Sequence, residues 1–505
     1  MTAVACTRPP DEPRVHSERI GSIGSGYRRN SLVVSRDHRR FAWVKQVGDA
    51  CWVVVDGRKG PRFARCTNPL FSPDGETVAY WATETVEDPP RAHLVINGEP
   101  QPAVVSDQGA IAFSRTGGGW ASIAPVRVEP KPAQDASAGD ESAKPQDDDA
   151  KPQSDDAATQ QNDAAATSRR LVVESSLGNL GEYRDTSNPA VSPDGKHVAF
   201  VALDDDGQQV LIVDGKQVRA FGMPQTSFLP AIKQTKSGPG LEPEATVRYL
   251  PDGSLVGVAL GENGWTVFHG ERTLAEYAGL RLPPKAGFEV TQSELRSAPA
   301  ILAGSLVVAE EAPVACWWER LEGEADRWRV VCNGAPIDAQ VCDAPSSEHP
   351  IQVAPDGKSA MYVCTRAVDA PPDADPSETR ELWVVLPDRQ IGPHRFVWAL
   401  ERLPDGSHFA YAAADSLTDP WYYVVDGKRV DGPWQHVFPP KISPDGSIVV
   451  WGASQDPDGK RVDLVRNGRV LTRAQVVMSP PRFGPDGSVQ WVVRRGNSLR
   501  RVIFD

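Results

Sequence analysis

Short apolar runs separated by turn-forming residues recur along the whole chain. Within them, apolar and polar positions alternate with the two-residue period of a β-strand. Residues 77–80, 197–200 and 408–411 are typical, and each run has a small residue near its centre. No long helical periodicity competes with this pattern. The chain is therefore predicted to be all-β.

A tight turn stands before most of these runs. Proline presets the first corner of a type I turn, aspartate bonds a nearby amide, and glycine supplies the positive φ that lets the next strand start. Worn copies of this turn, in which one or more of the three residues are replaced, occur at residues 35–38, 114–117 and 302–305. They lie in the gaps between the intact copies, so the chain contains about ten units. Intact Pro-Asp-Gly turns placed before such an apolar run number seven, beginning at Pro73, Pro193, Pro251, Pro355, Pro404, Pro444 and Pro485.

A second turn, Asp-Gly or Asn-Gly, follows about 20 residues later at the end of an apolar strand. Its copies begin at Asp56, Asn97, Asp214, Asn333, Asp426 and Asn467. These dipeptides between apolar runs are the strongest short-range signal of a β-hairpin. Each unit thus contains four antiparallel strands in about 40 residues, the size of a propeller blade.

At this spacing the turns resemble those of TolB-like and WD-repeat-like β-propellers, and the resemblance runs from about Val33 to Asp505. It implies a propeller fold and little about function, because such repeats serve many purposes. TolB itself looks like an α/β domain followed by a six-bladed propeller. No α/β domain is recognised before the first repeat of this chain, so the partner-binding role of TolB is not carried over.

The last unit is short of a strand. After Gly487 we expect strands near residues 489–494 and 499–504, whereas residues 15–27 precede the first turn and have the length of a strand. We predict that residues 15–27 complete the final blade and close a single ring of about ten blades, or of eight or nine if a worn repeat forms none. Two smaller propellers are the alternative. The predicted propeller spans residues 15–505, after a flexible tail at 1–14.

Within the third unit, residues 130–167 contain no aromatic residue and are rich in Ala, Asp, Gln, Lys, Pro and Ser. Such a composition predicts a disordered, acidic insert. Ten acidic residues and three lysines between Glu129 and Ser168 supply about half of the formal charge of −13. An acidic chain without a basic footprint argues against nucleic acid as a partner.

Six of the seven cysteines lie in predicted blades, and none has the spacing of a zinc site. Two interpretations stay open for them. They are buried free thiols, or they form up to three disulfides between neighbouring strands, which would imply an oxidising compartment. The six are Cys51, Cys66, Cys316, Cys332, Cys342 and Cys364.

The seventh cysteine, Cys6, follows small residues and precedes a polar, proline-rich stretch. This resembles the end of a bacterial lipoprotein signal and makes Cys6 a candidate lipidation site. The charged and apolar regions of such a signal are missing, so lipidation requires a true start upstream of Met1. The alternative is an ordinary disordered N-terminus. No segment approaches the roughly 20 apolar residues of a membrane span.

No nucleophile elbow, phosphate-binding loop or dinucleotide fingerprint occurs, and the nine histidines are scattered. We therefore predict no catalytic, cofactor-binding or metal-ligating residue. Binding is expected at three long loops, residues 224–243, 280–297 and 369–381. Of the tryptophans, Trp120 and Trp434 lie near turns and are candidate rim contacts. Eight others are predicted to fill the wedges between blades: Trp43, Trp52, Trp81, Trp265, Trp383, Trp421, Trp451 and Trp491.

These observations favour a monomeric, non-catalytic binding or scaffold propeller that needs no cofactor. Its unknown partner would be a protein or a glycan, in the periplasm or cell envelope. The alternatives are a propeller enzyme, either a lyase or a glycan hydrolase, with its site in the central channel, and a cytoplasmic interaction platform. Sequence motifs do not reveal a site assembled from distant blades.

Overall fold

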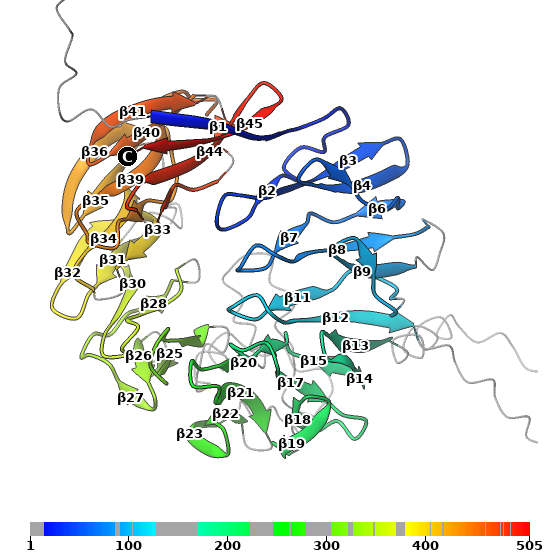
Figure 1. The fold of residues 1–505 in the computed structure, drawn as a ribbon. Coiled ribbons are helices and arrows are strands. Elements are labelled where there is room, and N and C mark those ends of the chain that lie inside the picture. Colours follow the sequence, from blue (N-terminus) through cyan, green and yellow to red (C-terminus); the bar gives the residue numbers. More distant parts are fainter. Residues whose placement is uncertain are drawn as a thin grey trace, which may run out of the picture.

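The computed structural model is a single ring of ten β-sheets arranged as the blades of a propeller (Figure 1). It describes residues 15–85, 91–103, 105–127, 169–222, 246–261, 264–278, 305–321, 327–346, 349–369, 379–403, 406–416, 419–459, 461–474, 476–477, 479–484 and 486–504. These ranges contain no α-helix. The predicted tail at 1–14 and the insert at 130–167 lie outside them.

The first five blades follow one another along the chain, each from its innermost to its outermost strand. Blade 1 contains β2 (Val33–Val34), β3 (Phe41–Val47), β4 (Ala50–Val55) and β5 (Arg58–Lys59). Blade 2 contains β6 (Arg65–Cys66), β7 (Leu70–Phe71), β8 (Val78–Thr83), β9 (Ala92–Ile96) and β10 (Glu99–Pro100). Blade 3 contains β11 (Ala110–Phe113), β12 (Trp120–Arg127), β13 (Arg169–Ser175) and β14 (Gly178–Tyr183). Blade 4 contains β15 (Asp185–Thr186), β16 (Ala190–Val191), β17 (Val198–Leu203), β18 (Gln209–Val213) and β19 (Lys216–Ala220). Blade 5 contains β20 (Thr246–Tyr249), β21 (Leu255–Gly261), β22 (Gly264–His269) and β23 (Arg272–Ala278).

The other five blades complete the ring. Blade 6 contains β24 (Val307–Val308), β25 (Ala315–Arg320), β26 (Trp328–Cys332) and β27 (Ala335–Pro336). Blade 7 contains β28 (Ala344–Pro345), β29 (Gln352–Val353), β30 (Ala360–Ala367), β31 (Arg380–Val385) and β32 (Gln390–His394). Blade 8 contains β33 (Phe396–Arg402), β34 (Phe409–Ala414), β35 (Trp421–Val425) and β36 (Lys428–Trp434). Blade 9 contains β37 (His436–Val437), β38 (Lys441–Ile442), β39 (Val449–Ser454), β40 (Val462–Arg466) and β41 (Arg469–Ala474). Blade 10 contains β42 (Val476–Val477), β43 (Arg482–Phe483), β44 (Val489–Arg495), β45 (Ser498–Phe504) and β1 (Val15–Ser22).

The predicted closure by the N-terminus is confirmed. β1 pairs antiparallel with β45 along its length, from Val15 opposite Phe504 to Ser22 opposite Ser498. The closing strand is shorter than residues 15–27, and Tyr27 instead forms a bridge with Lys45 of blade 1.

Ten apolar cores, one in each seam between neighbouring blades, hold the ring together. Such a complete set is what a single closed ring requires, so the alternative of two smaller propellers is excluded. The core between blades 10 and 1 is the smallest, with five buried residues against seven to eleven in the others. It contains Ile23, Phe41, Trp43, Val54 and Leu499. This last seam therefore has the fewest buried apolar residues among the ten.

The predicted Pro-Asp-Gly turns are confirmed. In all seven copies the glycine has positive φ, and its amide donates to the carbonyl three residues earlier, at 2.8–3.0 Å. Two worn copies form the same turn, closed by the amides of His38 and Gly117. His38 adopts φ +58° where the intact copies have glycine. The third worn copy lies almost wholly outside the described residues.

The six Asx-Gly turns also fasten a central strand in blades 1, 2, 4, 6, 8 and 9. The Asx residue of each turn has φ between 47° and 51°, and its side-chain oxygen accepts the first amide of that strand. In blade 2, for example, Asn97 Oδ1 accepts Val78 N at 2.8 Å. Where the Asx residue is Asp, its second oxygen pairs with Arg40, His197 or His408. Where the Asx residue is Asn, the residue directly before the fastened strand, in the position of Arg40, His197 or His408, is uncharged. Charge is thus matched within each repeat.

Substituting Asn97 with alanine should destabilise the protein by about 2 kcal/mol. The change leaves the Val78 amide without its acceptor and places alanine at a left-handed φ of 51°. Asn97→Asp keeps an acceptor oxygen and should cost less than half as much. Urea unfolding of both variants measures the difference, and equal losses would show that the acceptor contributes nothing.

His38 lies in the closing seam and is 4% exposed. Burial lowers its pKa to about 4, and the charges of Arg482 on β43 and Arg501 on β45 add to this effect. Asp37, in the same turn as His38, acts in the opposite direction. The imidazole is therefore neutral at neutral pH.

Acidification is consequently expected to weaken this seam. The pKa of His38 in the folded state, about 4, is below its ordinary value of 6.5, so the unfolded chain binds more protons between these values. The free energy of unfolding falls as pH drops from about 6.5 to about 4, by on the order of 3 kcal/mol. Urea unfolding across this range measures the loss. His38→Asn tolerates positive φ and should lack this part of the pH dependence; an unchanged profile would contradict the assignment.

Candidate functional site

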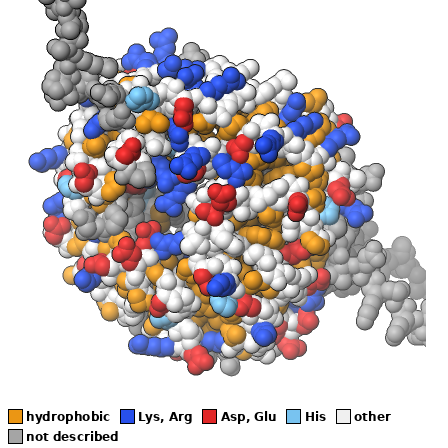
Figure 2. Space-filling model, viewed as in Figure 1, with side chains coloured by type: hydrophobic (Ala, Val, Ile, Leu, Met, Phe, Trp, Pro, Cys, Tyr) orange, Lys and Arg blue, Asp and Glu red, His pale blue; other side chains and the backbone are white. Residues whose placement is uncertain are grey.

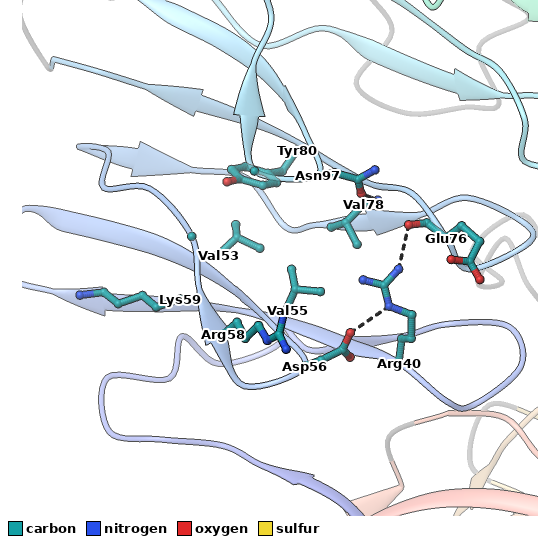
Figure 3. A pocket seen from close by; sticks show the side chains of 12 residues that line it. Arg40, Val53, Val55, Asp56, Arg58, Lys59, Glu76, Val78, Tyr80 and Asn97 are labelled. Atoms are coloured by element: carbon teal, nitrogen blue, oxygen red, sulfur yellow. Dashed lines mark hydrogen bonds and ion pairs between the residues drawn. The ribbon is translucent and has the colours of Figure 1, made fainter.

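Blades 1 and 2 enclose two clefts at opposite ends of the same strands. The turn-side cleft, of about 750 Å³, adjoins the tight turns at the end of β4 and the start of β8 (Figure 3). Val53, Val55, Val78 and Tyr80 face one another across it. Arg40 connects its walls, because the guanidinium binds the Asp56 carboxylate and the carbonyls of the neighbouring blade at 2.8 Å.

The buried hydroxyl of Tyr80 in this cleft has no hydrogen-bond partner in the described part of the chain, and burial raises its pKa to about 12. It is therefore a neutral group with an unused O–H donor. On β5, Lys59 stacks over the Trp52 ring at 3.7 Å, and Figure 3 shows its ammonium pointing away from the cleft. Arg58, on the same strand, is exposed at the margin. The turn-side cleft thus combines an apolar floor with a cationic margin.

The loop-side cleft, of about 830 Å³, lies at the opposite ends of these strands and is strongly polar. The exposed amides of Gln46, Asn68 and Gln108 belong to its lining. Arg28 spans the two blades by donating to Cys66 O and Asn68 Oδ1, both at 2.7 Å, and burial lowers its pKa. This cleft therefore presents hydrogen-bonding groups from three blades.

A disulfide between Cys51 and Cys66 lies in the wall of the loop-side cleft and joins blade 1 to blade 2. A second inter-blade disulfide, Cys342–Cys364, joins blades 6 and 7, and Cys316–Cys332 joins β25 to β26 within blade 6. The sequence left open whether these six cysteines are buried free thiols or form disulfides, and the structure contains the disulfides. Both inter-blade bonds follow a blade whose outer strand, β5 or β27, has only two residues.

A further candidate group lies on the first strand of blade 8. The innermost strand β33 has seven residues and a bulge between Trp398 and Glu401, where Ala399 has φ +54°. Trp398 is 46% exposed and is the one aromatic residue among the large exposed apolar side chains of the described ranges. Glu401 forms an ion pair with Lys441 of blade 9 at 2.7 Å. Bulges turn side chains away from regular positions, and none of these residues belongs to a motif.

The residues singled out in the sequence have mixed outcomes. Trp434 was predicted as a rim contact, but it is 5% exposed and donates to Asp431 at 3.1 Å inside the core of blades 8 and 9, so that prediction was wrong. Trp120 is half-buried against the core of blades 2 and 3. Cys6 and nearly all of the three long loops lie outside the described residues. Of the eight predicted wedge residues, Trp43, Trp81, Trp451 and Trp491 are buried, and Trp52, Trp265, Trp383 and Trp421 are partly buried.

Two structural surveys complete this description. Within the described ranges, no three His, Cys, Asp or Glu side chains come together as a metal site would require. No helix in this part of the chain has the length and apolar character needed to cross a membrane.

No protein-family model and no curated protein sequence matches the chain. Similar solved structures include a eukaryotic initiation factor, with 12% identity over 82% of this chain and 91% of that one and a TM-score of 0.39. The β-propeller domain of the Trilobed protease from Pyrococcus furiosus has 10% identity over 73% and 98%, with a TM-score of 0.30. TolB from Acinetobacter baumannii has 12% identity over 67% and 60%, with a TM-score of 0.20.

Proposed function

We propose that this chain is a non-catalytic binding propeller of an oxidising compartment, the bacterial periplasm or cell envelope, and that it holds a protein partner in the loop-side cleft. The Cys51–Cys66 disulfide carries the proposal, because it braces the two blades that form this cleft. A structural disulfide at that position fits a protein that works where thiols are oxidised.

The chemistry of the cleft favours a polypeptide over a sugar. Its exposed groups include amides, the Arg65 guanidinium and the Asp107 carboxylate, so both donors and acceptors are available to a backbone and to side chains of either charge. An aromatic surface for stacking is not exposed there, since Trp81, the aromatic residue in the lining, is 5% exposed.

Site-specific photocrosslinking tests the binding site. A crosslinker at Gln46 or Gln108, on the rim of the loop-side cleft, should yield one discrete adduct in cells of the source organism. The same group at Val218, which is 56% exposed on the outer strand of blade 4, is the matched control. No adduct from either cleft position, or the same adduct from Val218, would refute a partner in this cleft.

The compartment is tested separately. Metabolic palmitate labelling of the full-length product should label Cys6 if the chain is a lipoprotein, and Cys6→Ser should abolish the label. Unlabelled, intact protein in the cytosol would remove the envelope proposal. An enzymatic role in the channel is addressed by metal analysis of the purified protein and a substrate screen.

A glycan partner is a second candidate, favoured by one observation, the exposed Trp398 on β33. An exposed indole offers an apolar surface for the face of a sugar ring, and Glu401 on the same strand supplies an acceptor for its hydroxyls. Binding of oligosaccharides that is lost in Trp398→Ala and kept in a loop-side cleft variant would favour this candidate over a protein partner.

A further inference from the structure

The closing seam between blades 10 and 1 brings cationic groups together on one face. Arg482 of β43 pairs with Gln490 of β44, and two residues along β44, Val492 pairs with Arg501 of β45. Because side chains two apart in a strand share a face, Arg482 and Arg501 lie on the same side of blade 10. That side faces blade 1, since Leu499, two residues before Arg501, packs against Phe41 and Trp43 of blade 1.

Three buried nitrogen atoms in this seam have no hydrogen-bond partner among the described residues. They are Nη1 of Arg482, Nε of Arg501 and Nδ1 of His38, the last reaching in from the first turn of blade 1. His38 is 96% buried, and both guanidinium charges act on it electrostatically. Orphaned groups of this kind are rare in folded proteins, and each calls for a partner.

The carboxylates near these groups are already engaged. Glu18 of β1 forms an ion pair with Arg501 through Nη2, which leaves Nε unpaired. Asp37 accepts the Ser35 hydroxyl at 2.5 Å and the Arg39 amide at 3.1 Å within its own turn. A further cation, Arg36, lowers the pKa of Arg482 together with burial. Positive charge at this point of the ring therefore exceeds negative charge.

The excess extends over blade 10 as a whole. Its described residues, 15–22, 476–477, 479–484 and 486–504, include six arginines and two carboxylates, although the chain carries a net charge of −13. Figure 2 shows Lys and Arg side chains gathered along this blade and around the middle of the ring. A concentrated basic blade on an acidic protein draws anions towards the seam.

We propose that the closing seam is a binding site for a phosphate-class oxyanion, held by Arg482, Arg501 and His38. A tetrahedral anion offers oxygens in several directions, which matches three donors supplied by two strands of one blade and a turn of the next. Guanidinium groups bind phosphate through charge-assisted hydrogen bonds, and the Nδ1–H tautomer of neutral His38 donates the third. Bound anion would tie blade 10 to blade 1 where the apolar core is smallest.

Thermal unfolding of the full chain, followed by tryptophan fluorescence, tests the site with inorganic phosphate as the probe. Phosphate should raise Tm by several degrees in a saturable way relative to chloride at equal ionic strength, because a ligand of the folded state stabilises it. Isothermal titration should give a Kd that increases at least tenfold in Arg482→Gln. Arg469→Gln, on the exposed outer strand of blade 9, is the control and should bind as the wild type does.

Several outcomes would overturn the assignment. They are a Tm rise that chloride reproduces, a rise that persists unchanged in Arg482→Gln, and equal losses in both arginine variants. If Arg482→Gln does not fold, Arg482→Lys and His38→Asn replace it, and each should weaken phosphate binding while retaining the fold. Glycerol phosphate serves as a second probe: equal affinity indicates recognition of a phosphate monoester such as a lipid headgroup, and loss of binding indicates the free ion. The loop-side cleft plays no part, so failure here leaves the proposed function standing.

Discussion

Deletion of residues 1–22 should lower the free energy of unfolding by roughly 5 kcal/mol and lower Tm by about 5 °C. The closing strand β1 forms seven residue pairs with β45. Each backbone hydrogen bond in such a ladder contributes about 1 kcal/mol net. Without β1, the edge of β45 is left open, which favours association with other chains. Thermal unfolding with light scattering measures both effects, and deletion of residues 1–14, which leaves β1 intact, is the reference.

A point variant gives a milder form of the same test. A Cβ at Gly21 would overlap the ring of Phe41, which is 2% exposed in the small core of the closing seam. Gly21→Ala should therefore cost about 1–3 kcal/mol. Gly118→Ala is the matched control, because a Cβ there meets no atom within 4 Å. Equal stability of the two truncations, or of the two alanine variants, would show that the ring does not depend on this closure.

Reduction of the three disulfides should destabilise the protein at least as much as deletion of residues 1–22 does. The three bonds close loops with sequence separations of 15, 16 and 22 residues. A bond closing a 15-residue loop contributes about 3 kcal/mol by limiting the unfolded chain. Reduced protein should therefore unfold at a Tm well below that of oxidised protein. The paired variants Cys51→Ala/Cys66→Ala and Cys342→Ala/Cys364→Ala show how much of the lost stability comes from each of the two bridged seams.

The same preparation yields a thiol count. Denatured but unreduced protein should expose one reactive thiol, Cys6, and reduced protein should expose all seven. Seven thiols before reduction would contradict the disulfides and, with them, the oxidising compartment. A Tm that reductant leaves unchanged would mean that the apolar cores alone set the stability.

The architecture could be predicted from the sequence because its signals are local. A Pro-Asp-Gly turn depends on three adjacent residues, and an Asx-Gly hairpin depends on two. The strands of each repeat can therefore be predicted without reference to the other repeats. Even the worn turn ending at His38 kept its geometry, since the repeat imposes positive φ at that position. The closure of the ring by the N-terminus could be predicted because the last unit is short of one strand, and the number of strands in a unit is counted along the chain.

The candidate sites depend on neighbours that the sequence does not place together. The loop-side cleft needs Gln46 and Gln108, which belong to different blades, and the seam cluster joins His38 to Arg501 across the whole length of the chain. Trp398 escaped notice because its exposure results from a bulge at Ala399, a residue with no turn signature. Trp434 was misjudged because a turn-like sequence, Asp431 to Trp434, continues the strand β36.

The pairing of Val15 with Phe504 also determines how the ring would be held. The two ends of the described chain lie side by side at the outer edge of blade 10, where Figure 1 shows β1 and the C-terminus close together. A lipid, a surface tether or a fused domain at either end would therefore be attached to the ring at its outer edge, at blade 10. Both faces and the other nine blades would remain open to partners.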